Sequence, residues 1–265
     1  MNDKLLDIRA VRKKFIAEKH IFRADKYMTA VDDVSFDIKS GEILGLIGSS
    51  GCGKSTLAKM IVGLLKPDEG EVFFEGKDIG RLSGEKMRRL RPRLQMIQQN
   101  PFSCFNPRRK IINTLMDGII EHGIVSDKKE GREYILGTIL KCGLSEEHLD
   151  RYPSEFSGGQ LQRLAISRAV LLKPVLIIAD EIVSALDISI QDQILELLMQ
   201  FKTEREMSML FISHDLAVIK KISDRIIVMD KGKIIDSGET DYIFRISDNE
   251  YTNLLRESMV PFNYL

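Results

Sequence analysis

The chain has little cysteine and no excess of charge of either sign. Its 265 residues include three cysteines, too few and too scattered for a disulfide framework or a metal cluster: Cys52, Cys104 and Cys142. Basic and acidic residues balance at 39 each, and this neutrality argues against a dominant nucleic-acid-binding surface. A basic run over residues 86–93 is interpreted as a solvated helix face.

The sequence also lacks long apolar runs and internal repeats. No stretch approaches the ~18 apolar residues that a membrane span requires. Lys4, Asp7 and Arg9 interrupt any early run that could serve as a secretory signal. We therefore expect a protein of the reducing cytosol, with one large α/β domain and one copy of its site.

A glycine-rich segment, GSSGCGKS at residues 48–55, matches the pattern G-x-x-x-x-G-K-[ST]. The apolar run before it, residues 42–47, predicts a buried strand. The run after it, residues 55–65, predicts a helix that ends at a Lys-Pro-Asp-Glu-Gly segment and has these residues on one face: Leu57, Met60, Ile61 and Leu64. Strand, glycine loop and helix are the context of a phosphate-binding loop.

The residue types explain how such a loop binds a nucleotide. Glycines allow backbone conformations that place successive N–H groups around an anion at a helix N-terminus. Lys54 adds a positive charge for the β- and γ-phosphates, and the Ser55 hydroxyl is a ligand that suits Mg²⁺. We expect the same positive surroundings to lower the pKa of Cys52. The predicted nucleotide-binding residues of this segment are Gly48, Ser49, Ser50, Gly51, Cys52, Gly53, Lys54, Ser55 and Thr56.

Two further apolar runs end in polar residues. Residues 175–179 (VLIIA) are followed by Asp180 and Glu181, and residues 208–213 (SMLFIS) are followed by His214. Ligands gather at the carboxyl ends of parallel strands. We therefore predict that Asp180 serves Mg²⁺, and that Glu181 orients and deprotonates an attacking water. His214 would reach the γ-phosphate.

A second glycine-rich segment, FSGGQ at residues 156–160, precedes a run with helical spacing. Ser157 is predicted to be the N-cap, and the exposed amides and positive dipole end would form a second anion site. Taken alone, the segment would be read as an ordinary capped helix.

Together these segments resemble the ATP-binding subunits of ABC transporters, from near Leu6 to near Gly238. The resemblance makes residues 48–55 the Walker A segment and VLIIADE the Walker B segment. It makes FSGGQ the signature, with Ser157, Gly158, Gly159 and Gln160 contacting nucleotide. It makes SALD at 184–187 the D-loop, with Asp187, and His214 the switch histidine.

For two roles, the Q-loop glutamine and the aromatic residue that stacks on adenine, the resemblance favours one residue and leaves one alternative. In QMIQQNP, Gln99 matches the Q-loop glutamine that senses Mg²⁺ and the attacking water, and Gln98 is the neighbour with which it could be confused. Phe15 matches the aromatic residue that stacks on adenine. A long insertion, residues 16–29, follows Phe15, and Tyr27 within it is the alternative.

The expected fold is α/β. It has a P-loop NTPase (RecA-like) core, an antiparallel β subdomain and an inserted α-helical subdomain. The ATP-binding domain would cover residues 1–238, with the helical subdomain at about 101–172, and a short tail would cover 239–265. Two alternating sets predict antiparallel strands: Leu6, Ile8 and Ala10, and Val34, Phe36 and Ile38.

The resemblance further implies ATP and Mg²⁺ as ligands and a head-to-tail dimer, in which each nucleotide lies between one P-loop and the partner's signature. A companion ATPase in a heterodimer is expected, with a homodimer as the alternative. Two transmembrane permease subunits and an extracytoplasmic substrate-binding protein would complete the system, without nucleic acid. The chain would then work at the cytoplasmic face of the cell membrane. Two residues depart from the family pattern. Phe156 replaces the usual Leu of the signature, and Ile182 replaces the Pro that commonly follows the glutamate at 181 but leaves the acids intact.

Secondary features resemble the peptide/nickel importer group. They are the Asn-Pro-Arg segment within 101–111 and the tail pattern that includes Tyr251, Thr252 and Pro261; Asn249-Glu250 replaces the usual His-Pro. The DEIVSALD form and the early end of the chain favour nickel subunits over oligopeptide ones. The alternatives are a soluble ABC ATPase that is not coupled to transport and an exporter ATPase.

Overall fold

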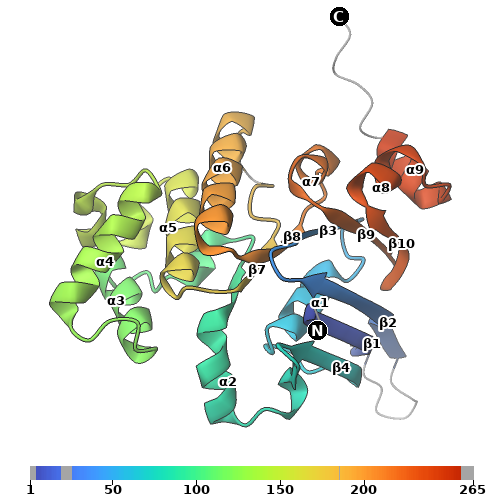
Figure 1. Ribbon diagram of the computed structural model, residues 1–265, viewed down its shortest axis with the longest axis horizontal. Coiled ribbons are helices and arrows are strands. Elements are labelled where there is room, and N and C mark those ends of the chain that lie inside the picture. The colour runs from blue at the N-terminus through green and yellow to red at the C-terminus, as the bar shows by residue number, and fades with distance from the viewer. Residues whose placement is uncertain (1–3, 19–25, 185, 258–265) are drawn as a thin grey trace, which may run out of the picture. The chain divides into compact units, whose positions relative to one another are not determined.

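A computed structural model describes residues 4–18, 26–184 and 186–257. The chain divides into two compact units, Met1–Met87 with Ser208–Leu265, and Arg88–Met207 (Figure 1). Ala185 of the SALD segment and Pro261 of the tail pattern lie outside the described residues.

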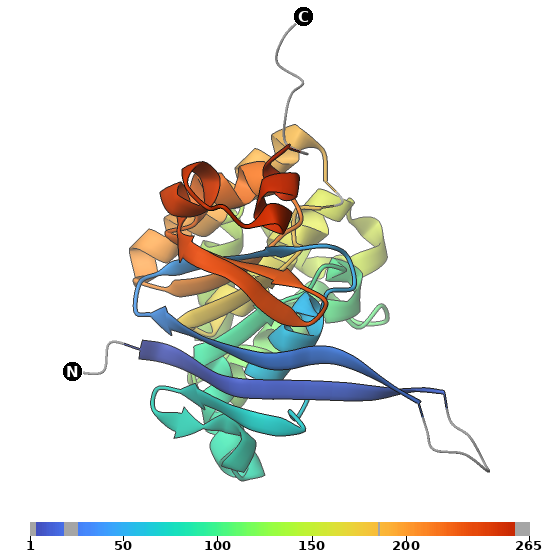
Figure 2. The same ribbon diagram turned by 90° about the vertical axis from the view of Figure 1, so that its right-hand side faces the viewer.

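The first unit contains an antiparallel sheet with the strand order β2-β1-β4-β5 (Figure 2). Its strands are β1 (Lys4–Glu18), β2 (Lys26–Lys39), β4 (Glu69–Phe74) and β5 (Lys77–Asp78). The predicted alternation is observed at Leu6 and Ile8, which are buried and pair with Ile38 and Phe36. This sheet is the expected antiparallel β subdomain.

The alternation fails at Ala10, which is exposed instead of buried. Ala10 has a φ of 47°, and the register between β1 and β2 shifts between Ile8 and Val11. A bulge of this kind moves every later side chain by one position. Val11 consequently takes the buried place that the sequence pattern assigned to Ala10.

The first unit also contains strands β3 (Ile43–Gly48), β8 (Ser208–Ile212), β9 (Arg225–Asp230) and β10 (Lys233–Glu239). β3 runs parallel to β8 on one side and to β9 on the other, and β10 is antiparallel to β9. Every residue of β3 and β8 is buried, as expected for strands covered on both faces.

The helices of the first unit include α1, which begins where the glycine loop ends. They are α1 (Lys54–Ile61), α7 (Leu216–Ile222), α8 (Thr240–Arg245) and α9 (Glu250–Glu257), with the short turn η1 (Ile79–Arg81); α2 (Gly84–Leu90) covers the sequence at the boundary with the second unit.

α1 is shorter than predicted. Leu64 donates its N–H to the Lys59 carbonyl at 2.9 Å, and Gly63, with a φ of 68°, donates to Met60 at 3.1 Å. These two bonds form the glycine-based motif that commonly ends helices. Leu64 therefore lies outside the helix and is exposed, whereas Leu57, Met60 and Ile61 are buried as expected.

The second unit combines a parallel strand pair with helices. β6 (Leu94–Ile97) and β7 (Leu176–Asp180) pair in parallel. The helices are α3 (Ile111–Glu121), α4 (Lys128–Lys141), α5 (Gly158–Leu171) and α6 (Ile188–Arg205); the short turns are η2 (Arg91–Arg93), η3 (Pro101–Cys104), η4 (Glu146–Asp150) and η5 (Pro153–Glu155). Among the residues that the structure describes, no helix combines the length and apolarity needed to cross a membrane.

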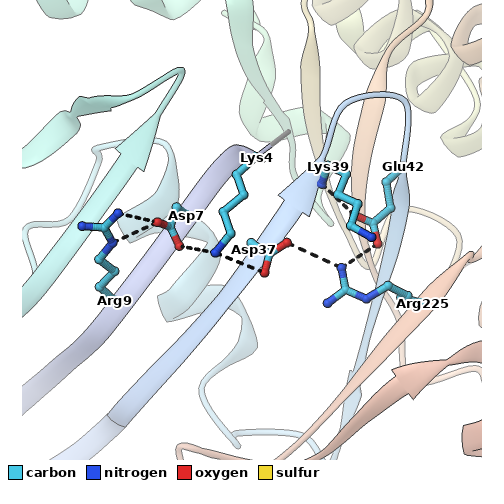
Figure 3. A network of polar contacts seen from close by, with 7 residues as sticks. All are labelled: Lys4, Asp7, Arg9, Asp37, Lys39, Glu42 and Arg225. Atoms are coloured by element: carbon cyan, nitrogen blue, oxygen red, sulfur yellow. Dashed lines mark hydrogen bonds and ion pairs between the residues drawn. The ribbon is translucent and has the colours of Figure 1, made fainter. Parts of the chain in front are cut away.

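A chain of ion pairs connects the antiparallel sheet of the first unit to the start of β3 and β9 (Figure 3). Arg225 contacts Glu42 at 2.9 Å and Asp37 at 3.7 Å, and Asp37 is 3.6 Å from the Lys4 ammonium. Glu42 is 7% exposed and also accepts the Lys39 N–H at 2.6 Å. A buried carboxylate needs such partners, so Glu42 helps to fix the antiparallel sheet against the start of β3 and β9.

We predict that Glu42→Ala lowers the free energy of unfolding by about 2 kcal/mol, because Arg225 and the Lys39 amide both lose a buried partner. Thermal and urea unfolding would measure the change. The control is Asp241→Ala, which breaks the exposed pair with Arg245 and should change stability by less than about 0.5 kcal/mol. Equal effects of the two substitutions would contradict the role of Glu42.

Candidate functional site

The backbone of the glycine loop lies against two other backbones of the first unit. A Cβ on Gly48 would stand 2.2 Å from the Met229 carbonyl oxygen, at the end of β9, and a Cβ on Gly53 would stand 2.1 Å from that of Ala30 in β2. Gly53 has a φ of 108° and is the N-cap of α1. Only glycine fits at these two positions, so the spacing of the sequence pattern has a steric cause.

Lys54 begins α1 and lies inside the loop. It is 4% exposed, and its ammonium donates to the carbonyl oxygens of Gly48 at 2.8 Å and Ser49 at 2.9 Å. These bonds keep the buried positive charge beside the loop. Ser50, Gly51 and Ser55 are exposed, and Thr56 is half-buried. The loop ends at the N-terminus of α1, a kind of position at which proteins commonly bind anions.

Two further segments of the first unit hold the loop, and the sequence patterns did not point to either. Gly232, in the turn between β9 and β10, donates its N–H to the Cys52 carbonyl at 3.0 Å. Tyr251, in α9, accepts the N–H of Ser49 on its hydroxyl at 3.0 Å. Tyr251 belongs to the tail pattern, but no signal in the sequence relates it to a loop some 200 residues earlier.

His214 lies at the same strand edge as the glycine loop. β3 and β8 pair in parallel with Leu46 opposite Ile212, so Gly48 and His214 each lie two residues beyond this pair along their chains. The N–H of Ser213 also bonds to Leu46 at 3.3 Å, and His214 is exposed. The structure thus brings the predicted histidine to the strand edge at which the glycine loop begins.

In the second unit, Gln99 and Glu181 meet. β6 and β7 pair with Ile97 opposite Ala179, which brings the two following residues to one edge. The Gln99 amide donates to the Glu181 carboxylate at 2.9 Å. Gln98 instead accepts the Ser103 hydroxyl at 3.0 Å. This difference favours Gln99 over Gln98 as the residue that acts with the carboxylate.

The two acids after β7 differ in their surroundings. Asp180 is the last residue of the strand and is 5% exposed. Glu181 is half-buried and has a φ of 50°, a left-handed conformation that costs a non-glycine residue energy and that clusters at functional sites. The Ser184 hydroxyl donates to the Glu181 carbonyl at 2.9 Å, and Ile182, which stands where the family has proline, is 2% exposed.

The second glycine segment forms a helix cap, as predicted. Ser157 accepts the Gln160 N–H on its hydroxyl at 3.3 Å, and the Gln160 side chain accepts the Ser157 N–H at 3.0 Å. Gly158 and Gly159 form the first turn of α5. Phe156, the other departure from the family pattern, is buried against His148, with ring centroids 5.5 Å apart. The exposed turn therefore has a rigid base.

Asp187 and the two aromatic candidates complete the predicted residues. Asp187 is exposed at the start of α6 and does not cap it with its side chain. Phe15 lies opposite Met28 in the β1–β2 pair, and Tyr27 lies opposite Ile16. Neighbouring residues of a strand point to opposite faces, so Phe15 and Tyr27 occupy different faces of the ribbon. They cannot serve the same binding surface.

The expectation that the pKa of the Cys52 thiol is lowered is wrong. Burial raises the pKa of Cys52, because desolvation disfavours the thiolate more than the nearby Lys54 charge favours it. The side chain is 4% exposed, with its sulfur 3.9 Å from the Lys54 ammonium. Burial likewise raises the pKa of Cys142, to about 12.

Comparisons with known proteins found similar sequences. A family model described as ABC transporter matches residues 31–184. The oligopeptide transport ATP-binding protein OppF of Bacillus subtilis is 41% identical over 256 residues, which are 96% of this chain and 82% of that protein. The dipeptide transport ATP-binding protein DppF of Escherichia coli is 39% identical over 251 residues, 95% of this chain and 75% of that protein.

Solved structures confirm the expected α/β fold class. A dimeric, post-hydrolysis structure of the ATP-binding cassette MJ0796 with ADP and phosphate has a TM-score of 0.78 and 26% identity, covering 89% of this chain and 98% of that chain. The structure of cbiO1 from Clostridium perfringens has a TM-score of 0.77 and 24% identity, covering 92% of both chains.

The raised pKa of Cys52 predicts slow alkylation. At pH 7 the thiolate should be scarce, and the rate should rise as the pH rises toward the raised pKa, since the thiolate is the nucleophile. Iodoacetamide labelling followed by site-resolved mass spectrometry would measure the rates. Cys104, which is half-buried, should label faster than Cys52, and Cys142 should label most slowly. Faster labelling of Cys52 than of Cys104 at pH 7 would show that the lysine charge dominates after all.

Proposed function

This chain belongs to the ABC transporter family and is an ATPase of that family, and from this premise we propose that it energises a peptide importer from the cytoplasmic face of the membrane. The observation that carries the proposal is the Gln99–Glu181 hydrogen bond of 2.9 Å at the edge of β6 and β7. The hydrogen bond joins the Glu181 carboxylate, which can accept a proton, to the Gln99 side-chain amide, which can contact a bound ligand. A merely structural strand end would not need this pair.

The glycine loop is proposed to bind the triphosphate of ATP. The helix N-terminus at which the loop ends and the buried Lys54 suit an anion. A Cβ at Gly48 or Gly53 would clash with the backbone of β9 or β2 and so disturb the loop. The Lys54 ammonium, now bonded to two loop carbonyls, would transfer its donors to phosphate oxygens. His214 would contact the γ-phosphate from the end of β8.

The donor set also fits Mg²⁺. The Ser55 hydroxyl, the Asp180 carboxylate and the Gln99 side-chain carbonyl are hard oxygen ligands, and the Asp180 side chain is buried at a strand end. A bound Mg²⁺ would neutralise negative charge on the phosphates. Charge neutralisation and positioning account for most of the catalysis in phosphoryl transfer.

Glu181 is the proposed base. Its left-handed backbone and the hydrogen bond from Gln99 hold the carboxylate in one place, where it can orient a water molecule and take its proton. Gln99 is a positioning residue in this scheme. Its side chain would relay changes in the nearby 101–104 turn to the carboxylate.

The signature turn is proposed to complete the nucleotide site of a partner subunit. Ser157, Gly158 and Gly159 expose helix N-terminal groups without a lysine, and Asp187 is exposed at the start of α6. The structurally similar cassette MJ0796 is a dimer with ADP and phosphate. We infer that this chain pairs with a companion ATPase, and that a homodimer is the alternative.

Peptide is the proposed cargo. Sequence features favoured nickel, but both curated relatives described above are named for oligopeptide or dipeptide transport. Two permease subunits and an extracytoplasmic binding protein would complete the importer. The rival readings, a soluble ABC ATPase or an exporter ATPase, do not account for about 40% identity that extends along nearly the whole chain, tail included.

The opposite orientation of Phe15 and Tyr27 allows the adenine contact to be tested. Base stacking on an aromatic ring contributes about 1–3 kcal/mol, so Phe15→Ala should weaken ATP binding at least about 5-fold, and Tyr27→Ala should leave it unchanged. Binding of inorganic triphosphate, which lacks adenine, should be the same in both variants. If Tyr27→Ala alone weakens ATP binding, the stacking residue is Tyr27.

Glu181→Gln should lower ATP turnover by at least ~100-fold, because the amide cannot accept the proton of the attacking water. MgATP binding should be retained. The matched control is Glu196→Gln, an exposed position on α6, which should hydrolyse ATP at the wild-type rate. Turnover of Glu181→Gln within a few-fold of wild type would mean that the base is misassigned.

Uptake by the source cells distinguishes the cargo. Cells with wild-type protein or with Glu181→Gln would be given a labelled small peptide and ⁶³Ni²⁺ in parallel. Selective loss of peptide uptake is expected. Selective loss of nickel uptake would overturn the peptide assignment, and unchanged uptake of both would leave an ABC ATPase with another cargo.

A further inference from the structure

The tail of the chain contacts the phosphate-binding loop through Tyr251. The Tyr251 hydroxyl of α9 accepts the N–H of Ser49, the first residue after Gly48, at 3.0 Å. Tyr251 and Thr252 belong to the tail pattern that the sequence singled out, and nothing in the proposed reaction uses them. The contact lies within the first unit, which contains both the loop and the tail.

The helix that carries Tyr251 is tied to β10 by buried polar groups. The Asp236 carboxylate of β10 accepts the Thr252 hydroxyl at 2.7 Å and also the Ser247 hydroxyl. Thr252 and Ser247 are 1% and 3% exposed. The Asn249 side-chain amide donates to the Ile235 carbonyl at 2.9 Å, so the start of α9 is tied to two neighbouring residues of β10. A tail bound this firmly can act as a fixed support.

Three hydrogen bonds of the loop region meet at the backbone of Ser49. Its carbonyl accepts the Lys54 ammonium at 2.9 Å and the Cys52 N–H at 3.2 Å, while its own N–H is directed at Tyr251. The peptide before Ser49 and the Lys54 side chain are therefore oriented by the same residue. Removing the hydroxyl of Tyr251 frees one end of this arrangement.

We propose that Tyr251 is a positioning residue for ATP binding, which acts through the backbone of Ser49 and not by touching the nucleotide. The proposal rests on the assignment of residues 48–55 as the phosphate site. By holding the Ser49 peptide, the hydroxyl keeps the loop in its nest-forming shape before ATP arrives, so that less conformational entropy is lost on binding. The tail is thereby part of the ATP site and not an appendage.

Tyr251→Phe tests the hydroxyl alone. One neutral hydrogen bond at an exposed position corresponds to about a 2- to 10-fold change in an equilibrium constant, so the Kd for ATP should rise by that factor in the purified full-length chain. Tyr242→Phe is the matched control, because Tyr242 lies in the same tail, in α8, and is 41% exposed. Its Kd should equal that of wild type.

Two readouts separate positioning from a general loss of structure. Hydrogen exchange at the Ser49 amide should accelerate in Tyr251→Phe and stay unchanged in Tyr242→Phe, with the thermal midpoint preserved in both. In the importer assembled with its companion chains, KM for ATP should rise while kcat changes by less than about two-fold, since the hydroxyl does not act in the chemical step.

The anchor provides an independent variant. Asp236→Asn should weaken ATP binding through the displaced helix, and in the double variant with Tyr251→Phe the two effects should not add, because both act through one contact. Additive effects would overturn the proposed route.

The proposal also falls if Tyr251→Phe binds ATP as tightly as wild type or more tightly. Tighter binding would mean that the Tyr251 hydroxyl opposes ATP binding. Failure of the underlying site would look different. In that case Lys54→Ala and wild type would bind ATP equally, whatever Tyr251 does.

Discussion

The close approach of three backbones at the glycine loop is the constraint on which the site depends. Gly48 and Gly53 leave room for the carbonyls of Met229 and Ala30, at separations that no Cβ would permit. The loop lies against β9 and β2 in this way, and the buried Lys54 ammonium bonds to the Gly48 and Ser49 carbonyls. The shape of the proposed anion site therefore depends on packing between strands that are far apart in the sequence.

The proposed catalytic side depends on a different kind of constraint, a strained backbone held by side-chain hydrogen bonds. Glu181 adopts a left-handed conformation immediately after a fully buried strand, and Gln99 and Ser184 hold its carboxylate and its carbonyl. Strain of this type persists only where the surroundings compensate for it. The buried Ile182 shows that the usual proline is not required for that conformation, since apolar packing can hold the turn.

Within the first unit, two contacts between separate elements are made by polar groups with little solvent access. Glu42 and Arg225 link β3 and β9 to the antiparallel sheet, and Asp236 ties the tail helix to β10. Such groups are costly unless every partner is present, so they specify one arrangement more strongly than apolar contacts would. This second cluster ties to β10 the helix whose Tyr251 contacts the glycine loop.

The amino-acid sequence by itself determined the local elements and the chemistry of the site. Buried strands, the glycine loop, the Ser157 cap and the acids after β7 all follow from short patterns, because each depends on neighbours within a few residues. The tertiary structure alone decided the bulge that exchanges Ala10 for Val11, the early end of α1, and the hydrogen bond between Gln99 and Glu181. It also reversed the expected pKa shift of Cys52 and brought Tyr251 to Ser49. These outcomes depend on burial, register and contacts between distant segments, which no local pattern contains.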